Sequence, residues 1–162
     1  MNKALKRFSR LARLRIVHTA IFAAVVVGLV TSPTFAGTWT TDSAAALEEA
    51  ATSKKLVLYA FVGNGWDDAS MNLKKKVLSQ REFLTALDEE YLLVELSVPV
   101  VSDNASDEVK ELMEKYNVMI FPALIVVNSE GKELDEQRYV LKAVNWYVKK
   151  YNRLASRHLT KK

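Results

Sequence analysis

Residues 54–70 read KKLVLYAFVGNGWDDAS. An uninterrupted apolar run, Leu56 to Val62, lies between two lysines and the turn residues Gly63-Asn64-Gly65. A short apolar run bounded by a turn is typical of a strand that is buried on both faces. Asp67 and Asp68 follow, and aspartate commonly starts a helix because its carboxylate accepts hydrogen bonds from the free amides of the first turn. The stretch therefore predicts a central strand that leads through a turn into a helix.

The rest of the chain alternates between helical and extended patterns. Helices are predicted over 44–52, 67–78, 107–116 and 141–158, with Ser79 as the cap of one further short helix that contains Phe83 and Leu87. Strands are predicted over 91–98, 123–127 and, after a turn at 128–131, about 133–140. Alternation of this kind predicts an α/β fold in one domain, with a sheet covered by helices.

The sequence contains no cysteine. This absence removes disulfides, thiolate nucleophiles and thiolate metal ligands together. The sequence also has no glycine-rich phosphate loop and no histidine–carboxylate arrangement, so no cofactor and no metal site are expected.

The basic charge of the chain is concentrated at its N-terminus. The first 36 residues carry six of the 23 lysines and arginines and no acid, which leaves 17 basic against 19 acidic residues in 37–162. The net charge of +4 thus becomes about −2 in the remainder. A partner nucleic acid is not expected, because its attraction depends on a basic surface.

Residues 1–36 have the order of a secretory signal peptide. A basic stretch, Lys3 to Arg15, precedes the apolar run Ala20 to Val30, and Thr34-Phe35-Ala36 offers small residues for cleavage. We predict cleavage after Ala36 and a periplasmic or secreted domain over 37–162 with no stable membrane span. The alternative is an uncleaved anchor, although the run is shorter than the ~20 residues of a typical span.

Five segments, in this order and spacing, resemble the thioredoxin-like family: 54–61, 61–66, 77–83, 116–123 and 128–132. They resemble the first core strand, the approach to the active-site helix, the segment after that helix, the approach to a cis-proline, and a hairpin turn. The resemblance covers roughly 39–155 and implies a thioredoxin-like fold, with a central mixed β-sheet of four to five strands flanked by helices. It also implies a cis peptide bond before Pro122.

The sequence departs from the family at its chemistry. Trp66 precedes Asp67-Asp68-Ala69-Ser70, so Asp67 and Ser70 stand where the family carries the two cysteines of its Cys-x-x-Cys pair. A carboxylate cannot form the mixed disulfide, and a serine hydroxyl cannot resolve one. The strand 56–62 also lacks the buried acid of many thioredoxins. Thioredoxin-type oxidoreductase activity is therefore not expected.

The retained family features favour a non-catalytic binding module, chaperone-like or accessory, for a protein or peptide. The resemblance implies that Trp66, Asp67, Phe121 and Pro122 line a groove in which a partner strand could pair. The alternative for these residues is that Trp66, Phe121 and Pro122 only pack together.

Two further alternatives remain at this stage. Asp67 and Asp68 could form an acid/base or metal-assisted site, although helix capping alone would explain an acid at this position. The chain could also be a purely structural subunit whose other surfaces meet a partner.

Overall fold

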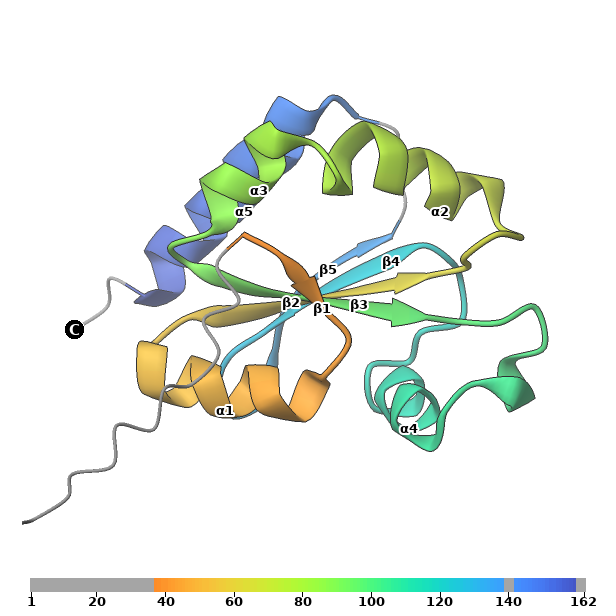
Figure 1. The fold of residues 1–162 in the computed structure, drawn as a ribbon. Helices are drawn as coiled ribbons and strands as arrows, with labels where there is room; N and C mark the ends of the chain where they lie inside the picture. Colours follow the sequence, from red (N-terminus) through yellow and green to blue (C-terminus); the bar gives the residue numbers. More distant parts are fainter. Residues whose placement is uncertain (1–36, 139–141, 160–162) are drawn as a thin grey trace, which may run out of the picture. The chain divides into compact units, whose positions relative to one another are not determined.

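A computed structural model of the chain describes residues 37–138 and 142–159. These residues form the following elements in chain order (Figure 1): β1 (Trp39–Thr40), α1 (Ser43–Ser53), β2 (Leu56–Val62), α2 (Asp68–Leu73), the π-helix η1 (Lys74–Leu78), α3 (Arg81–Leu87), β3 (Tyr91–Ser97), the 3-10 turn η2 (Ser102–Asn104), α4 (Asp107–Lys115), β4 (Ala123–Val127), β5 (Glu133–Arg138) and α5 (Val144–Leu159).

The strands form one mixed sheet in the order β1-β3-β2-β4-β5. Strand β3 runs parallel to both β1 and β2, whereas β4 is antiparallel to β2 and to β5. The segment α2-η1-α3 crosses over the sheet between the parallel strands β2 and β3, as a parallel pair requires. The predicted mixed sheet of four to five strands flanked by helices is confirmed, with five strands.

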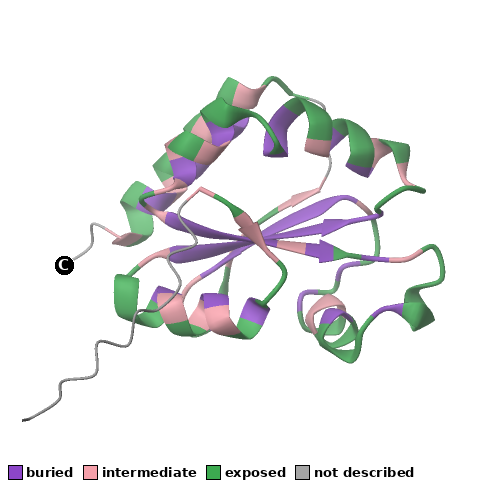
Figure 2. Cartoon of the chain, viewed as in Figure 1, coloured by how far each residue is buried: buried purple, intermediate pink, exposed green. Residues whose placement is uncertain are grey.

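Strand β2 lies at the centre of this sheet, and all of its residues are buried. Alternate side chains enter two separate cores, because successive residues of a strand point to opposite faces. Val57, Tyr59 and Phe61 pack with α1 and α4, whereas Leu58 and Ala60 pack with the layer of α2, η1, α3 and α5. Figures 1 and 2 show these helices on opposite faces of the sheet, with their buried stripes turned toward it.

Aromatic side chains join α3 and α5 to the sheet. Phe83 of α3 stacks on Trp39 at a centroid distance of 6.4 Å and meets Tyr151 of α5 edge to face at 6.3 Å. The Tyr91 hydroxyl of β3 donates to the Tyr151 carbonyl at 2.7 Å. Burial raises the pKa of the Tyr151 phenol well above its ordinary value, so this side chain remains a neutral part of the core.

Several predicted boundaries were wrong. Helix α3 begins after Gln80 with no side-chain cap, so Ser79 does not cap it. Residues 142 and 143 are not helical, and α5 begins at Val144 rather than near Leu141, which itself lies outside the described residues. The predicted helix 67–78 is an α-helix that continues as a π-helix. The short strand β1 was not predicted.

Other predictions fall outside the described residues. These are the leader 1–36 with its cleavage site and the last two residues of the predicted strand 133–140. Among the described helices, none has the length and apolar character needed to cross a bilayer.

The aromatic layer yields a stability test. Phe83→Ala should lower the free energy of unfolding by about 3–5 kcal/mol, because it removes a fully buried ring and leaves a cavity. Thr85→Ala, an exposed change on the same helix, should stay within about 0.5 kcal/mol of the wild type. Urea unfolding of the three proteins measures both values, and a loss below about 1 kcal/mol for Phe83→Ala would contradict this packing.

Candidate functional site

The turn after β2 depends on a glycine that lies against a tryptophan. A Cβ at Gly63 would lie 2.7 Å from ring atoms of Trp66 and from the Asp67 Cβ, so the Trp66 ring packs directly on the Gly63 backbone. The Asp67 amide donates to the Gly63 carbonyl at 3.1 Å and closes the turn. The Trp66 indole N–H donates to the Val98 carbonyl at 2.8 Å, which fixes the ring against the end of β3.

Asp67 and Ser70, the two positions that replace the family cysteines, are bonded to each other. The Ser70 amide donates to Asp67 Oδ2 at 2.8 Å, and the Ser70 hydroxyl donates to the same oxygen. The buried Ser70 hydroxyl in turn accepts from the Gly63 amide at 2.9 Å. Asp67 is thus the N-cap of α2, and the polar chain ties the end of β2 to the first turn of the helix.

Asp67 therefore has a structural role as a helix cap. Its carboxylate caps the helix, whereas Asp68 is exposed in the first turn, where a negative charge stabilises the positive end of the helix dipole. Within residues 37–138 and 142–159, no three histidine or acidic side chains are gathered in a way that could hold a metal ion.

A second polar cluster supports the same turn from the neighbouring strand. Lys74 of η1 forms an ion pair with Glu95 of β3 at 2.6 Å. The Asn64 amide nitrogen donates to Glu95 Oε1 at 3.1 Å and to Ser97 Oγ at 3.2 Å. Strand β2 has no acidic residue, but Glu95 of the neighbouring strand β3 is largely buried. The sequence indicated this site only by a single glutamate inside the otherwise apolar stretch 91–98.

The segment before β4 meets the turn through its aromatic residue. The Phe121–Pro122 peptide bond is cis. Phe121 is half-buried and meets Trp66 edge to face at a centroid distance of 5.9 Å, while Pro122 is buried. Three of the four residues predicted to line a groove, Trp66, Asp67 and Phe121, therefore reach the surface, and Pro122 lies beneath it.

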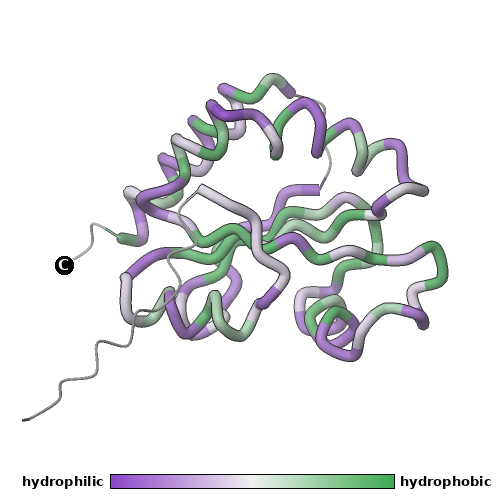
Figure 3. Tube along the Cα trace, viewed as in Figure 1, coloured by the Kyte–Doolittle hydropathy of each residue, from purple (hydrophilic) through white to green (hydrophobic). Residues whose placement is uncertain are grey.

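Exposed apolar side chains lie in the two loops that Trp66 contacts. Trp66 is 38% exposed, Val100 and Val101 are 70% and 54% exposed, and Met119 and Ile120 are 79% and 61% exposed. Trp66 links them, because its N–H binds Val98 in one loop and its ring meets Phe121 in the other. The loops that carry them lie at one end of the sheet, and the tube there has hydrophobic stretches between hydrophilic ones (Figures 1 and 3). We call Trp66, Val100, Val101, Met119, Ile120 and Phe121 the loop-end surface.

The sequence analysis did not identify four members of this surface. Val100 and Val101 follow Pro99, and Met119 and Ile120 precede Pro122, in segments without helical or alternating spacing. Their signal was an apolar pair within two residues of a proline, outside any predicted helix or strand.

Capping predicts a specific response to mutation. Asp67→Ala should lower the free energy of unfolding by about 1–2 kcal/mol, and Asp67→Asn should lower it far less, because asparagine also accepts at an N-cap. Asp68→Ala should cost no more than about 1 kcal/mol through the helix dipole. Chemical unfolding of the variants measures all three, and equal losses for the Asn and Ala variants would show that Asp67 acts through its charge rather than as a cap.

The contact between positions 67 and 70 predicts that cysteines placed there would bond. A chain with Asp67→Cys and Ser70→Cys should form an intramolecular disulfide under mild oxidation, because the side chain at the N-cap position 67 already contacts the side chain at 70. The control, Asp68→Cys with Ser70→Cys, should keep free thiols, because residues two apart on a helix do not face each other. Thiol titration and intact mass distinguish the outcomes, and two free thiols at 67 and 70 would contradict the site geometry.

The chain matches one protein family and several solved structures. A family model described as thioredoxin-like matches residues 38–129. A solved DsbH oxidoreductase is 24% identical, with 73% of this chain and 83% of that chain covered and a TM-score of 0.65. No curated protein sequence matches the chain significantly.

Two other solved structures share the fold. A thioredoxin from Thermus thermophilus is 19% identical, with 74% of this chain and 88% of that chain covered and a TM-score of 0.59. The C-terminal domain of Neisseria meningitidis DsbD in the oxidised form is 23% identical, with 71% and 97% covered and a TM-score of 0.53. The present chain has the fold without any cysteine, so it is not a dithiol–disulfide catalyst. On its sheet, its helix order and the family match, the chain belongs to the thioredoxin-like family.

Proposed function

We propose that this chain is an exported accessory protein that binds an extended, apolar segment of a partner protein at the loop-end surface and performs no redox chemistry. The observation that carries the proposal is the set of exposed apolar side chains contributed by three loops around Trp66. Contiguous exposed apolar surface is uncommon on proteins without a partner and commonly marks an interaction site.

The backbone before β4 offers a second means of recognition. Met119, Ile120 and Phe121 lie outside the helices and strands, and their backbone groups form no hydrogen bond with the backbone of another described residue. An extended peptide laid along this segment could pair with these backbone groups, as in strand addition. Side chains of the peptide would then meet Met119, Ile120 and Trp66.

The polar groups around the surface favour an apolar partner. Lys74 beside the turn is paired with Glu95, Arg138 beside Asn117 is paired with Glu136, and the Asp67 carboxylate accepts from Ser70. Affinity at this surface would therefore come mainly from burial of apolar area, at roughly 25 cal/mol per Å². The charge of about −2 that remains after the predicted leader gives no reason for a nucleic acid to bind.

The export part of the proposal rests on the sequence alone. The basic stretch Lys3 to Arg15, the apolar run Ala20 to Val30 and the small residues before Gly37 have the order of a secretory signal. In an oxidising compartment, a chain without cysteine could meet unfolded, thiol-bearing partners and form no mixed disulfide with them.

A permanently unfolded protein serves as the probe. Reduced, carboxymethylated α-lactalbumin should bind the chain in calorimetry, and Met119→Ser with Ile120→Ser should weaken this binding by roughly 10- to 100-fold, because two apolar contacts are lost. Both side chains are largely exposed, so the substitutions should leave the free energy of unfolding nearly unchanged.

The matched control is Trp146→Ser. Trp146 is 37% exposed, almost the same fraction as Trp66, but it lies on α5 in a different surface. This variant should bind the probe like the wild type. A wild-type chain that ignores the probe, or a double variant that binds it unchanged, would refute the proposed site.

A further inference from the structure

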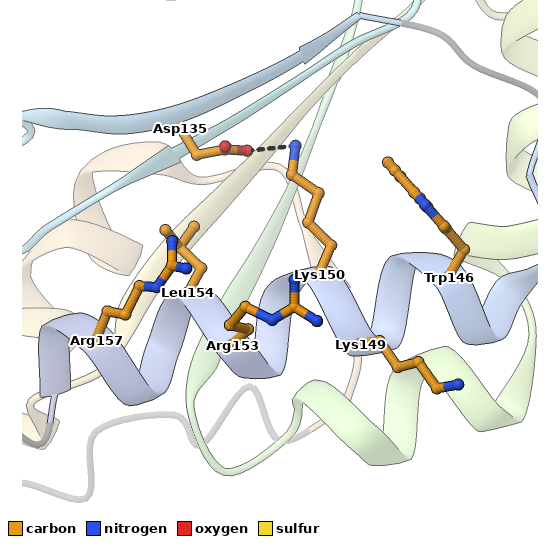
Figure 4. Close-up of a pocket in the computed structure, with 7 residues that line it drawn as sticks. All are labelled: Asp135, Trp146, Lys149, Lys150, Arg153, Leu154 and Arg157. Atoms are coloured by element: carbon orange, nitrogen blue, oxygen red, sulfur yellow. Dashed lines mark ion pairs between the residues drawn. The ribbon is translucent and has the colours of Figure 1, made fainter.

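A second surface, between α5 and β5, has a different chemistry. A groove of about 290 Å³ lies there, with Lys149, Lys150, Arg153 and Arg157 of α5 and Asp135 of β5 among its lining residues. Figure 4 shows that the two arginines rise from the same stretch of α5 as Lys150 and that the Lys149 ammonium projects away from the sheet. The groove therefore gathers three cations and one acid, with Lys149 at its outer rim.

The acid is already neutralised. Asp135 forms an ion pair with Lys150 at 2.7 Å, and the Lys150 ammonium also donates to Gln137 at 2.9 Å. Within the part of the chain that the structure describes, Lys149, Arg153 and Arg157 have no ion pair. The groove thus holds two arginine charges that no ion pair compensates, and Lys149 adds a third charge at its outer rim.

The helix dipole explains only part of this pattern. A cation is favoured within the last turn of a helix, which accounts for Arg157 near the end of α5 at Leu159. Lys149 and Arg153 lie further from that end. The three cations recur every fourth residue, so they follow one face of the helix at intervals of about 6 Å along its axis.

The groove also offers an apolar side. Trp146 stands at its N-terminal end, 37% exposed, with the Lys150 ammonium 6.0 Å from its ring centroid. The partly buried Leu154 lies between the two arginines in sequence and lines the same groove. A ligand could thus place its anionic groups at the arginines and a less polar part against the indole.

We propose that this α5 groove binds phosphate groups of a ligand that carries more than one negative charge. Guanidinium groups match phosphate oxygens through paired hydrogen bonds, which makes arginine the preferred side chain for this task. The phosphates could belong to a soluble polyphosphate-type molecule or to an anionic phospholipid headgroup, which share this chemistry. The site is independent of the loop-end surface, because it uses other elements and charge rather than apolar area.

Calorimetry with sodium tripolyphosphate tests the soluble source on the full chain. Arg153→Gln with Arg157→Gln should weaken binding at least about tenfold, the effect of losing one charge-assisted hydrogen bond or more. The control, Lys75→Gln with Lys76→Gln, removes the same charge from exposed lysines of η1 and should bind nearly like the wild type. Asp135→Asn should bind more tightly, because it frees Lys150 and adds one net positive charge.

Vesicles of phosphatidylglycerol, with phosphatidylcholine vesicles for comparison, test the lipid source. Every variant keeps the same residues 1–36, so binding by that basic segment is common to all and the difference between variants reports the groove. The proposal is supported if the arginine variant loses binding and the lysine control does not. Loss of tripolyphosphate binding identifies a soluble phosphate ligand, and loss of phosphatidylglycerol binding identifies a lipid headgroup. The proposal fails if wild type binds neither, or if the lysine control loses as much as the arginine variant.

Discussion

The complete burial of β2 is the constraint on which the rest of the structure depends. A strand whose alternate side chains are apolar on both faces can be stable in water only if both faces are covered. Helices α1 and α4 cover one face, and α2, η1, α3 and α5 cover the other. The chain must therefore leave β2 by a turn that delivers the next helix at once to the second face. This requirement places Gly63, Trp66 and Asp67 at the end of the sheet.

At that turn, Asp67 and Ser70 occupy the positions of the family cysteines and are joined by hydrogen bonds. The bonds of Ser70 to Asp67 and Gly63 satisfy a helix amide, a buried hydroxyl and the amide that follows β2. Each of these groups would cost free energy if it were buried without a partner. The same position can thus carry either a reactive pair or a structural link, because the fold requires only that the first turn of the helix be capped. Dithiol–disulfide catalysis is lost with the cysteines, while the capped first turn of the helix is kept.

The sequence predicted the buried strands best. The bounds of β2 and β4 agree with the prediction to the residue, because uninterrupted apolar runs end abruptly at turns. Strand β1 has only two residues, too few for any periodic pattern, and it forms because β3 offers a free edge. Nothing in the residues Lys74-Lys75-Lys76 distinguishes a π-helix from an α-helix. Helix α5 starts at Val144 although the apolar spacing already begins at Leu141, because spacing gives the face of a helix more reliably than its first residue.

The sequence allowed prediction of the contact between Trp66 and Phe121 and of the Asp67 helix cap. It did not allow prediction of the other exposed residues of the loop-end surface. Asp67 beside a turn and Trp66 before it carried local signals, and the family resemblance brought Phe121 next to them. Exposure of Val100, Val101, Met119 and Ile120 depends on where two loops emerge from the completed sheet, and an apolar residue in sequence normally indicates a core. Likewise, basic residues near the end of the predicted C-terminal helix suit the helix dipole and indicate no partner by themselves, and their groove exists only once Asp135 of β5 lies beside that helix.

The two surfaces should respond to salt in opposite ways, which follows from their chemistry. Binding at the loop-end surface depends on removal of apolar side chains from water, an effect that sulfate-type salts strengthen. Binding in the α5 groove depends on exposed charges, whose attraction is screened over about 8 Å at physiological ionic strength. A partner that used both surfaces would therefore combine a salt-resistant and a salt-sensitive contribution. This fold can provide both because different elements form them: the loop-end surface lies in the loops after β2 and β3 and before β4, whereas the groove is lined by α5 and by Asp135 of β5.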